Sequence, residues 1–391
     1  MAQWDITKKG TEFQFAASTT AWVDGDYFPV DVNHILTVSA DLAGAGNLKA
    51  RILEINPSTF AITATISEQS LSSDIVGAGA CSAARLDDTH FILSWTSDSP
   101  VKVYTRVISV DVSTYAITQE STTTTISSDP NFAGGARLSE IDDENTLITY
   151  NRNDGNGTGT YELASEIVTT NTSTWKTTGG TPTILGGVTG FSNYLASVAK
   201  VDSTHYIIVF YDTVPNIKAG VVTIDTGAGT VTITDSFVTI SAGNLRHSVE
   251  MLTSTRGVVC YYDNTDTIAE TIDLDGSYAI TTTGTTYTID ATAADDTSVI
   301  RVTGDHALIC YDDASSTDGK SIVVSVDSGT GNIAAEGTPV QYNASVTANV
   351  EVYKYDLNHF IVISNSGTNG EAVVLEIEDV PEPFKPKISF S

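Results

Sequence analysis

The sequence predicts an all-β fold made of seven repeats of four strands, and three observations lead to this prediction. The 391 residues are rich in Thr, Val, Ile, Ser and Tyr, while Gly and Asp separate short apolar runs, as is typical of strands and turns. A short pattern that contains a histidine recurs along the whole chain. The last repeat lacks its fourth strand, and the segment before the first repeat can supply it.

The recurring pattern is a turn, Asp-x-x-His in its commonest form, that leads into an apolar strand. It reads VDVNHILTV at 30–38, RLDDTHFIL at 85–93, VDSTHYIIV at 201–209, VTGDHALIC at 302–310 and YDLNHFIVI at 355–363. We call the place of the histidine the register position; its residues are His34, His90, Asn145, His205, Arg256, His306 and His359. Successive register positions are 50 to 60 residues apart, so the repeats almost fill the chain.

Each repeat contains the signals of four strands, as the fourth repeat illustrates. A segment of small and apolar residues at 197–201 precedes the turn, and strongly apolar, alternating and Thr-rich segments follow at 206–211, 219–225 and 230–238. Repeats of four strands that occur seven times predict a single seven-bladed β-propeller with antiparallel blades.

The two ends of the chain predict how the ring closes. The seventh repeat has three strand segments and then runs into VPEP at 380–383, whereas the outer-strand patterns at 4–7 and 12–15 precede the first repeat. A strand within residues 1–19 is therefore expected to complete the last blade, which pairs two edges that would otherwise be exposed. We expect a propeller over 1–379 and a Pro-rich arm over 380–391.

The repeat rows also resemble a known group of proteins. VDSTHYIIVFYD and LDDTHFILSWT resemble the "LDSTHFVVAY"-type repeats of propeller proteins found in bacteriophage tail proteins and bacterial surface proteins. The resemblance lies in the repeated pattern and covers nearly the whole chain. It implies the propeller fold, but the group has no shared catalytic residues that could be assigned to this chain. The chain departs from the pattern at Asn145 and Arg256 in place of His, and at Thr253 and Thr303 in place of Asp.

The residues of the repeated turn are interpreted as structural. The Asp can accept backbone N–H bonds within the turn, and the His can donate to a neighbouring strand. Histidines spread around a ring cannot converge on one ion, so no metal site is expected there. The predicted turn residues are Asp31, His34, Asp87, His90, Asp202, His205, His306, Asp356 and His359.

A basic residue recurs five places before the register position, at Arg85, Lys200, Arg301 and Lys354, with Arg137 nearby in the third repeat. The first interpretation is pairing with an acid or a carbonyl group of the adjacent blade. The alternative is a cationic ring along the propeller axis that binds an anion.

The opposite face of the ring collects the loops after each second strand, and there we place a tentative ligand-binding surface. An aromatic residue followed by a polar one begins several of these loops, which is ordinary chemistry for sugar recognition. The alternative is that the aromatics belong to the blade core and the acids form turns. The residues are Trp95, Asp98, Tyr150, Asn151, Tyr211, Asp212, Tyr262, Asp263, Tyr311 and Asp312.

Charge and motif content narrow the classes of function. A net charge of −29 disfavours binding to nucleic acid or to an anionic membrane. Cys81, Cys260 and Cys310 do not form a disulfide framework, and we expect reduced thiols. The acidic loops at 151–157 and 312–319 lack the spacing of a calcium loop, so neither metal nor cofactor is expected. No nucleophile elbow or phosphate loop is visible, which predicts a protein that is not an enzyme.

These observations predict a non-catalytic virion protein of a tailed phage or virus, either a tail or fibre adhesin or a head or neck decoration, present in multiple copies. The N-terminus, MAQWDITKKG, has no signal-peptide pattern, so assembly in the host cytoplasm is expected. The loop face would bind a host-surface glycan or protein, and Phe384, Ile388 and Phe390 of the arm would anchor the chain to other virion proteins. The alternative is a glycan-active enzyme, a hydrolase or lyase, with carboxylates on the loop face.

Overall fold

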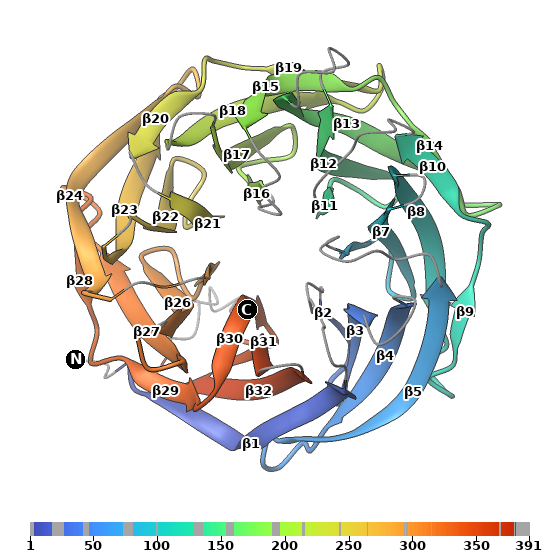
Figure 1. Ribbon diagram of the computed structural model, residues 1–391, viewed down its shortest axis with the longest axis horizontal. Helices are drawn as coiled ribbons and strands as arrows, with labels where there is room; N and C mark the ends of the chain where they lie inside the picture. The colour runs from blue at the N-terminus through green and yellow to red at the C-terminus, as the bar shows by residue number, and fades with distance from the viewer. Residues whose placement is uncertain are drawn as a thin grey trace, which may run out of the picture.

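The architecture is known from a computed structural model. It describes residues 4–17, 27–41, 47–72, 81–98, 101–127, 136–153, 160–189, 196–212, 216–241, 244–263, 265–292, 294, 296–313, 315–366, 369–378 and 380. These residues form an all-β ring of seven antiparallel sheets, as Figure 1 shows. The fold class that the repeats predict is therefore confirmed. The part of the chain that is described contains no helix able to cross a membrane.

Each sheet is one blade, and the first strand of each blade lies next to the axis of the ring (Figure 1). Blade 1 comprises β2 (Tyr27–Asp31), β3 (His34–Asp41), β4 (Asn47–Ile55) and β5 (Ile62–Ser72). Blade 2 comprises β6 (Ser82–Arg85), β7 (His90–Asp98), β8 (Val101–Val110), β9 (Ile117–Gln119) and β10 (Thr124–Ser127). Blade 3 comprises β11 (Ala136–Glu140), β12 (Asn145–Asn153), β13 (Thr160–Asn171), β14 (Lys176–Gly179) and β15 (Thr183–Thr189).

The later blades follow the same order. Blade 4 comprises β16 (Ser197–Lys200), β17 (His205–Tyr211), β18 (Ile217–Asp225), β19 (Thr230–Ile233) and β20 (Val238–Ser241). Blade 5 comprises β21 (Asn244–Met251), β22 (Arg256–Tyr262), β23 (Thr267–Leu274) and β24 (Ile280–Asp290). Blade 6 comprises β25 (Thr297–Arg301), β26 (His306–Asp313), β27 (Asp318–Val326), β28 (Ile333–Ala335) and β29 (Val340–Asn343). In blades 2, 3, 4 and 6 the fourth strand is split in two, and both parts pair with the third strand.

Blade 7 contains both ends of the ring. Its strands are β30 (Val346–Lys354), β31 (His359–Ser366), β32 (Asn369–Ile377) and the N-terminal β1 (Ile6–Ala17). Strands β1 and β32 pair antiparallel from Ile6 opposite Ile377 to Ala17 opposite Asn369. The predicted closure by an N-terminal strand is confirmed. Phe384, Ile388 and Phe390 lie outside the described residues, so the division into propeller and arm stays a prediction.

The hydrophobic core lies between neighbouring blades. The second strands are buried along almost their whole length, as in β17, where both faces pack against other blades. This double burial explains why the second strands read as continuous apolar runs in the sequence. The thiols of Cys81, Cys260 and Cys310 are fully buried in these layers.

Candidate functional site

The repeated turn is held by hydrogen bonds within itself. In blade 4, Asp202 Oδ1 accepts the backbone N–H groups of Thr204 at 2.8 Å and His205 at 2.9 Å, and the His205 ring Nδ1 lies 3.0 Å away. Burial raises the pKa of the Asp202 carboxyl, but the hydrogen bonds that it accepts outweigh this and hold the pKa below its usual range. The corresponding aspartate and histidine pairs are Asp31 and His34, Asp87 and His90, and Asp356 and His359.

Each register histidine also stacks on an aromatic ring of the adjacent blade. We call such a pair a ring latch. The ring centroids are 3.8 Å apart for His34 and Tyr115, 3.7 Å for His90 and Trp175, 3.7 Å for His205 and Tyr278, 3.9 Å for His306 and Trp4, and 3.6 Å for His359 and Phe60. Two tyrosines add a hydroxyl bond to the neighbouring turn, since Tyr115 and Tyr278 each donate to its aspartate at 2.8 Å.

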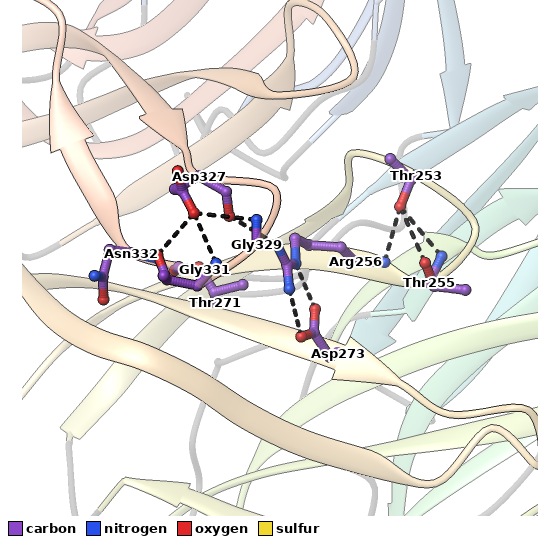
Figure 2. Close-up of polar contacts among 10 residues, drawn as sticks. Thr253, Thr255, Arg256, Thr271, Asp273, Asp327, Gly329, Gly331 and Asn332 are labelled. Carbon is purple, nitrogen blue, oxygen red and sulfur yellow. Dashed lines mark hydrogen bonds and ion pairs between the residues drawn. The ribbon is translucent and has the colours of Figure 1, made fainter.

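The two register positions without histidine face a glycine in place of the aromatic residue. Gly229 and Gly331 have left-handed φ angles of 66° and 72°, like Tyr278 at 64° in the equivalent turn. Figure 2 shows the second case: Arg256 donates to the Asp273 carboxylate at 2.6 and 2.7 Å and to the Asp327 carbonyl at 2.8 Å. The ring latches and Arg256 thus join adjacent blades, whereas the side chain of Asn145 bonds to Asp142 and Thr169 of its own blade.

The structure places the aromatics of the tentative loop-face surface differently from the first interpretation. Trp95, Tyr150 and Tyr311 are at most 2% exposed, so they are not stacking platforms but part of the blade core. Asn151 and Asp312 are buried as well. The prediction is wrong for these residues because their strands extend further and are covered by the neighbouring blades.

Two pairs of that surface remain partly exposed. Tyr211 with Asp212, and Tyr262 with Asp263, are half-buried at the ends of β17 and β22. The Asp212 carboxylate forms an ion pair with Lys218 at 2.5 Å. The side chain of Asp98 lies outside the described part of the structure. For these pairs a ligand-binding role stays a prediction.

The basic residues before the register position reach toward the preceding blade. Lys200 Nζ donates to the Ile141 carbonyl at 3.1 Å, and Lys354 Nζ donates to the Val302 carbonyl at 2.9 Å. Arg301 makes a longer bond of the same kind, at 3.4 Å. These bonds match the interblade interpretation, and they leave Lys200 and Arg301 exposed beside the axis.

A second set of charges lies on the inner strands. Arg137 of β11 forms an ion pair with Glu351 of β30, which joins blades 3 and 7 although 214 residues separate them. Both side chains are about one-fifth exposed, and Ser298 Oγ of blade 6 donates to Glu351 Oε2 at 3.3 Å. In the strand registers, the other four described blades carry serine at this place: Ser82, Ser197, Ser248 and Ser298.

Glu250 is the third charged side chain that departs from the repeat. It lies on β21, six places before the register position, where small or neutral residues stand in the other described blades. Burial raises the pKa of the half-buried Glu250 carboxyl to about 7, although Arg301 and Lys354 nearby favour its charged form. Burial and the nearby Arg301 in turn lower the pKa of Lys354.

We call these five side chains the axial charge cluster: Arg137, Glu250, Arg301, Glu351 and Lys354. The sequence already indicated Arg301, Lys354 and the nearby Arg137 as basic residues beside the axis, but Glu250 and Glu351 were missed. A signal was present for Glu250, because the residues six places before the other register positions are all uncharged. For Arg137 and Glu351 the signal is weaker: four repeats carry serine at their place, but the first carries Asp26. Among the described residues, no group of three or more potential ligands is placed to hold a metal ion.

The outer rim of the ring contains a separate cavity of about 330 Å³ at the closing seam. Trp4, Ile6 and Val340 line it together with the carboxylates of Asp5, Glu336 and Glu378. Trp4 is itself buried and stacks on His306, so this cavity borders the ring latch that the N-terminal strand completes.

Neither a protein-family model nor a curated protein matches this sequence. Solved structures with a similar fold include the WD40 domain of Toxoplasma gondii coronin, with 9% identity over 98% of this chain and 88% of that one, at a TM-score of 0.58. A Bacteroides uniformis protein assigned as a 6-phosphogluconolactonase has 10% identity over 90% and 99%, at 0.56. The polysaccharide lyase Uly1 has 8% identity over 95% and 100%, at 0.52. At these identities the likeness shows the propeller fold alone.

The prediction that the chain is not an enzyme, which rests on missing motifs, is wrong. Two of these similar structures carry the names of enzymes, a lactonase and a polysaccharide lyase, on a propeller of the same extent. A propeller brings residues together from separate blades, so a catalytic set need not form a contiguous motif. The absence of a nucleophile elbow or phosphate loop therefore has no bearing on catalysis in this fold.

Proposed function

We propose that this propeller binds an anionic polysaccharide at the axial charge cluster and cleaves its glycosidic bonds. The observation that carries the proposal is Glu250, a half-buried carboxyl with a pKa raised to about 7 beside two cationic side chains. A perturbed carboxyl with a specific charged neighbour is typical of a site that moves protons. Of the alternatives drawn from the sequence, a glycan-active enzyme is favoured, but its charged residues lie on the axis rather than on the loop face.

Glu250 suits proton transfer because of its environment. With a pKa near 7 the carboxyl is protonated in about half of the molecules at neutral pH, so it can give or take a proton there. An exposed glutamate of ordinary pKa would be almost fully ionised and would be a poor acid. The proposed role is to protonate the glycosidic oxygen as its bond to the sugar carbon breaks. In hydrolysis a water molecule adds to that carbon and loses a proton; in elimination the adjacent carbon loses its proton and a C=C bond forms.

The two cations supply the substrate preference. The chain has only 19 basic residues against 48 acidic ones, so most of its surface repels polyanions. Arg301 and Lys354 lie close enough to influence each other, and Arg301 is exposed. A carboxylate or sulfate of a sugar can be held there by charge-assisted hydrogen bonds. The polysaccharide lyase of similar fold is a precedent for a propeller that acts on a polysaccharide.

The test is incubation of the purified chain with uronate-containing polysaccharides. New reducing ends without unsaturated products would identify hydrolysis, and reducing ends with unsaturated uronates would identify elimination. Glu250→Gln should lower the rate at least a hundredfold, the usual contribution of a positioned acid or base. Failure of the native chain to shorten any anionic polysaccharide would contradict the proposal.

A matched control separates catalysis from folding. Glu166 in blade 3 is also buried, and burial raises its pKa to about 7, but it lies on the third strand of its blade and is bonded to Tyr150 at 2.7 Å. Glu166→Gln makes the same isosteric change in a similar environment. It should leave the cleavage rate within about twofold of the native rate, because this site is away from the inner strands.

We also propose a place for this activity on the particle of a tailed phage. The support is the resemblance of rows such as LDDTHFILSWT at 86–96 to repeats found in phage tail proteins. Residues 380–391 would attach the chain to other virion proteins in several copies, and the polysaccharide would be that of the host surface. Detection of the chain in gradient-purified particles tests the location. Particles that incorporate a chain truncated after residue 379 as well as the full chain would contradict the role of the arm.

A further inference from the structure

The ion pair between Arg137 and Glu351 is unusual in its place. It links blades 3 and 7, which are not neighbours in the ring. The serines that stand at the same place of the first strand in other blades bond to the next blade instead. Ser82 Oγ, for example, accepts the backbone N–H of Leu138 at 3.0 Å, and Ser197 Oγ accepts that of Val249 at 3.0 Å. The two charged residues therefore replace a structural serine that four described blades keep.

The pair is also accessible enough to exchange partners. Each side chain is about one-fifth exposed, so water reaches both charges. Because each side chain is also about four-fifths buried, the cost of removing both charges from water offsets much of their attraction, so the net stability from the pair is small. Replacing two serines by such a pair is therefore poorly explained by stability alone.

We infer that Arg137 is a second anion-binding residue of the site, which Glu351 occupies until an anionic group of the ligand replaces it. The inference rests on the proposed function for the class of ligand and names its subclass, a saccharide with two or more anionic groups. Lys354 lies three residues beyond Glu351 on β30. This spacing separates the two side chains by about 10 Å along the strand and places them on its opposite faces. One group would bind at Arg301 and Lys354, and the other at Arg137.

The two members of the pair should respond in opposite directions when they are changed. Arg137→Ser removes the second anion-binding group, whereas Glu351→Ser removes the internal competitor for it. Both substitutions introduce the serine that blades 2, 4, 5 and 6 carry at this place of their first strands, so the fold should tolerate them. A purely structural ion pair would make the two variants alike.

The experiment is calorimetric titration with galacturonic acid and its linear oligomers of two to four residues. It is done in the Glu250→Gln background so that no oligomer is cleaved. The affinity should rise by roughly tenfold or more between the monomer and the trimer, the factor for one added charge-assisted hydrogen bond. Arg137→Ser should abolish this rise, and Glu351→Ser should tighten trimer binding while leaving the monomer unchanged.

A control accounts for the altered net charge of the variant. Glu144→Ser removes an exposed acid from the turn of blade 3 and changes the net charge as Glu351→Ser does. It should not alter the ratio of trimer to monomer affinity. Equal affinities along the series, no binding of any oligomer, or a shift in the same direction for both serine variants would overturn the inference. Cleavage by the native chain without the affinity step would leave the proposed function intact and refute only this role of Arg137.

Discussion

Exchange of one ring latch for the glycine form tests whether the two forms are equivalent. The junction of blades 4 and 5 has His205 stacked on Tyr278, while the junction of blades 3 and 4 has Asn145 facing Gly229. The change is therefore His205→Asn with Tyr278→Gly. Asparagine can keep the turn bond, because Asn145 Nδ2 donates to Asp142 at 2.9 Å in the natural case.

The magnitudes follow from what each side chain contacts. Tyr278→Gly loses a stack worth about 1 kcal/mol and a hydroxyl bond to Asp202 worth about 1 kcal/mol, and regains about 1 kcal/mol because glycine adopts the left-handed φ freely. The net cost is about 1 kcal/mol. His205→Asn loses the same stack and should also cost about 1 kcal/mol. Since the double variant loses the stack once, its cost should fall short of the sum by about 1 kcal/mol.

Equilibrium denaturation of the native chain, the two single variants and the double variant measures this coupling. Tyr278→Phe is the control, because it removes the hydroxyl bond and keeps the stack. Strictly additive free-energy costs would contradict the predicted coupling, because they would show that the rings of His205 and Tyr278 act independently.

Three further predictions concern other parts of the ring. Burial holds the pKa of Glu166 at about 7, above its ordinary 4.5, so its contribution to stability is present below pH 4.5 and is lost as the pH rises through 7. Glu166→Gln should therefore match the native chain near pH 4 but gain up to about 3 kcal/mol at pH 8; a stability gap that does not change with pH would contradict this. Trp4→Ala should lower the Tm and expose β1 to proteolysis first, because Trp4 supplies the ring that stacks on His306. Gly284→Ala should destabilise the chain by about 2 kcal/mol, because the φ of Gly284 is +74° and a Cβ there would lie 2.5 Å from the backbone oxygen of Gly331 in blade 6. An unchanged Tm would contradict this close approach.

The periodic features of the chain could be predicted from its sequence, whereas the site could not. Strands, blade number and closure follow from patterns that recur or are complementary at the two ends, so each repeat supports the others. The ring latches also had a signal, since NPSTF at 56–60, DVSTY at 111–115 and NTSTW at 171–175 place an aromatic residue at the same point of each turn. Which histidine each ring would meet depends on the packing of neighbouring blades, which no single repeat contains.

The loop-face residues failed for a physical reason. Trp95 and Tyr311 lie within strands that continue to Asp98 and Asp313 and are covered by neighbouring blades, and a linear pattern cannot show how far that cover extends. Glu250 and Glu351 of the axial charge cluster escaped notice because each is an isolated acid at a place that most repeats fill with an uncharged residue. Arg137 and Glu351 are far apart in sequence, and only the closed ring brings them together.

The most direct test of the account is the cleavage of an anionic polysaccharide by the native chain, by Glu250→Gln and by Glu166→Gln. The native chain and the Glu166 variant should shorten the polymer at similar rates, while the Glu250 variant should bind it but be at least a hundredfold slower. Equal rates for the two variants, or no shortening by the native chain, would contradict the assignment of the site to the propeller axis.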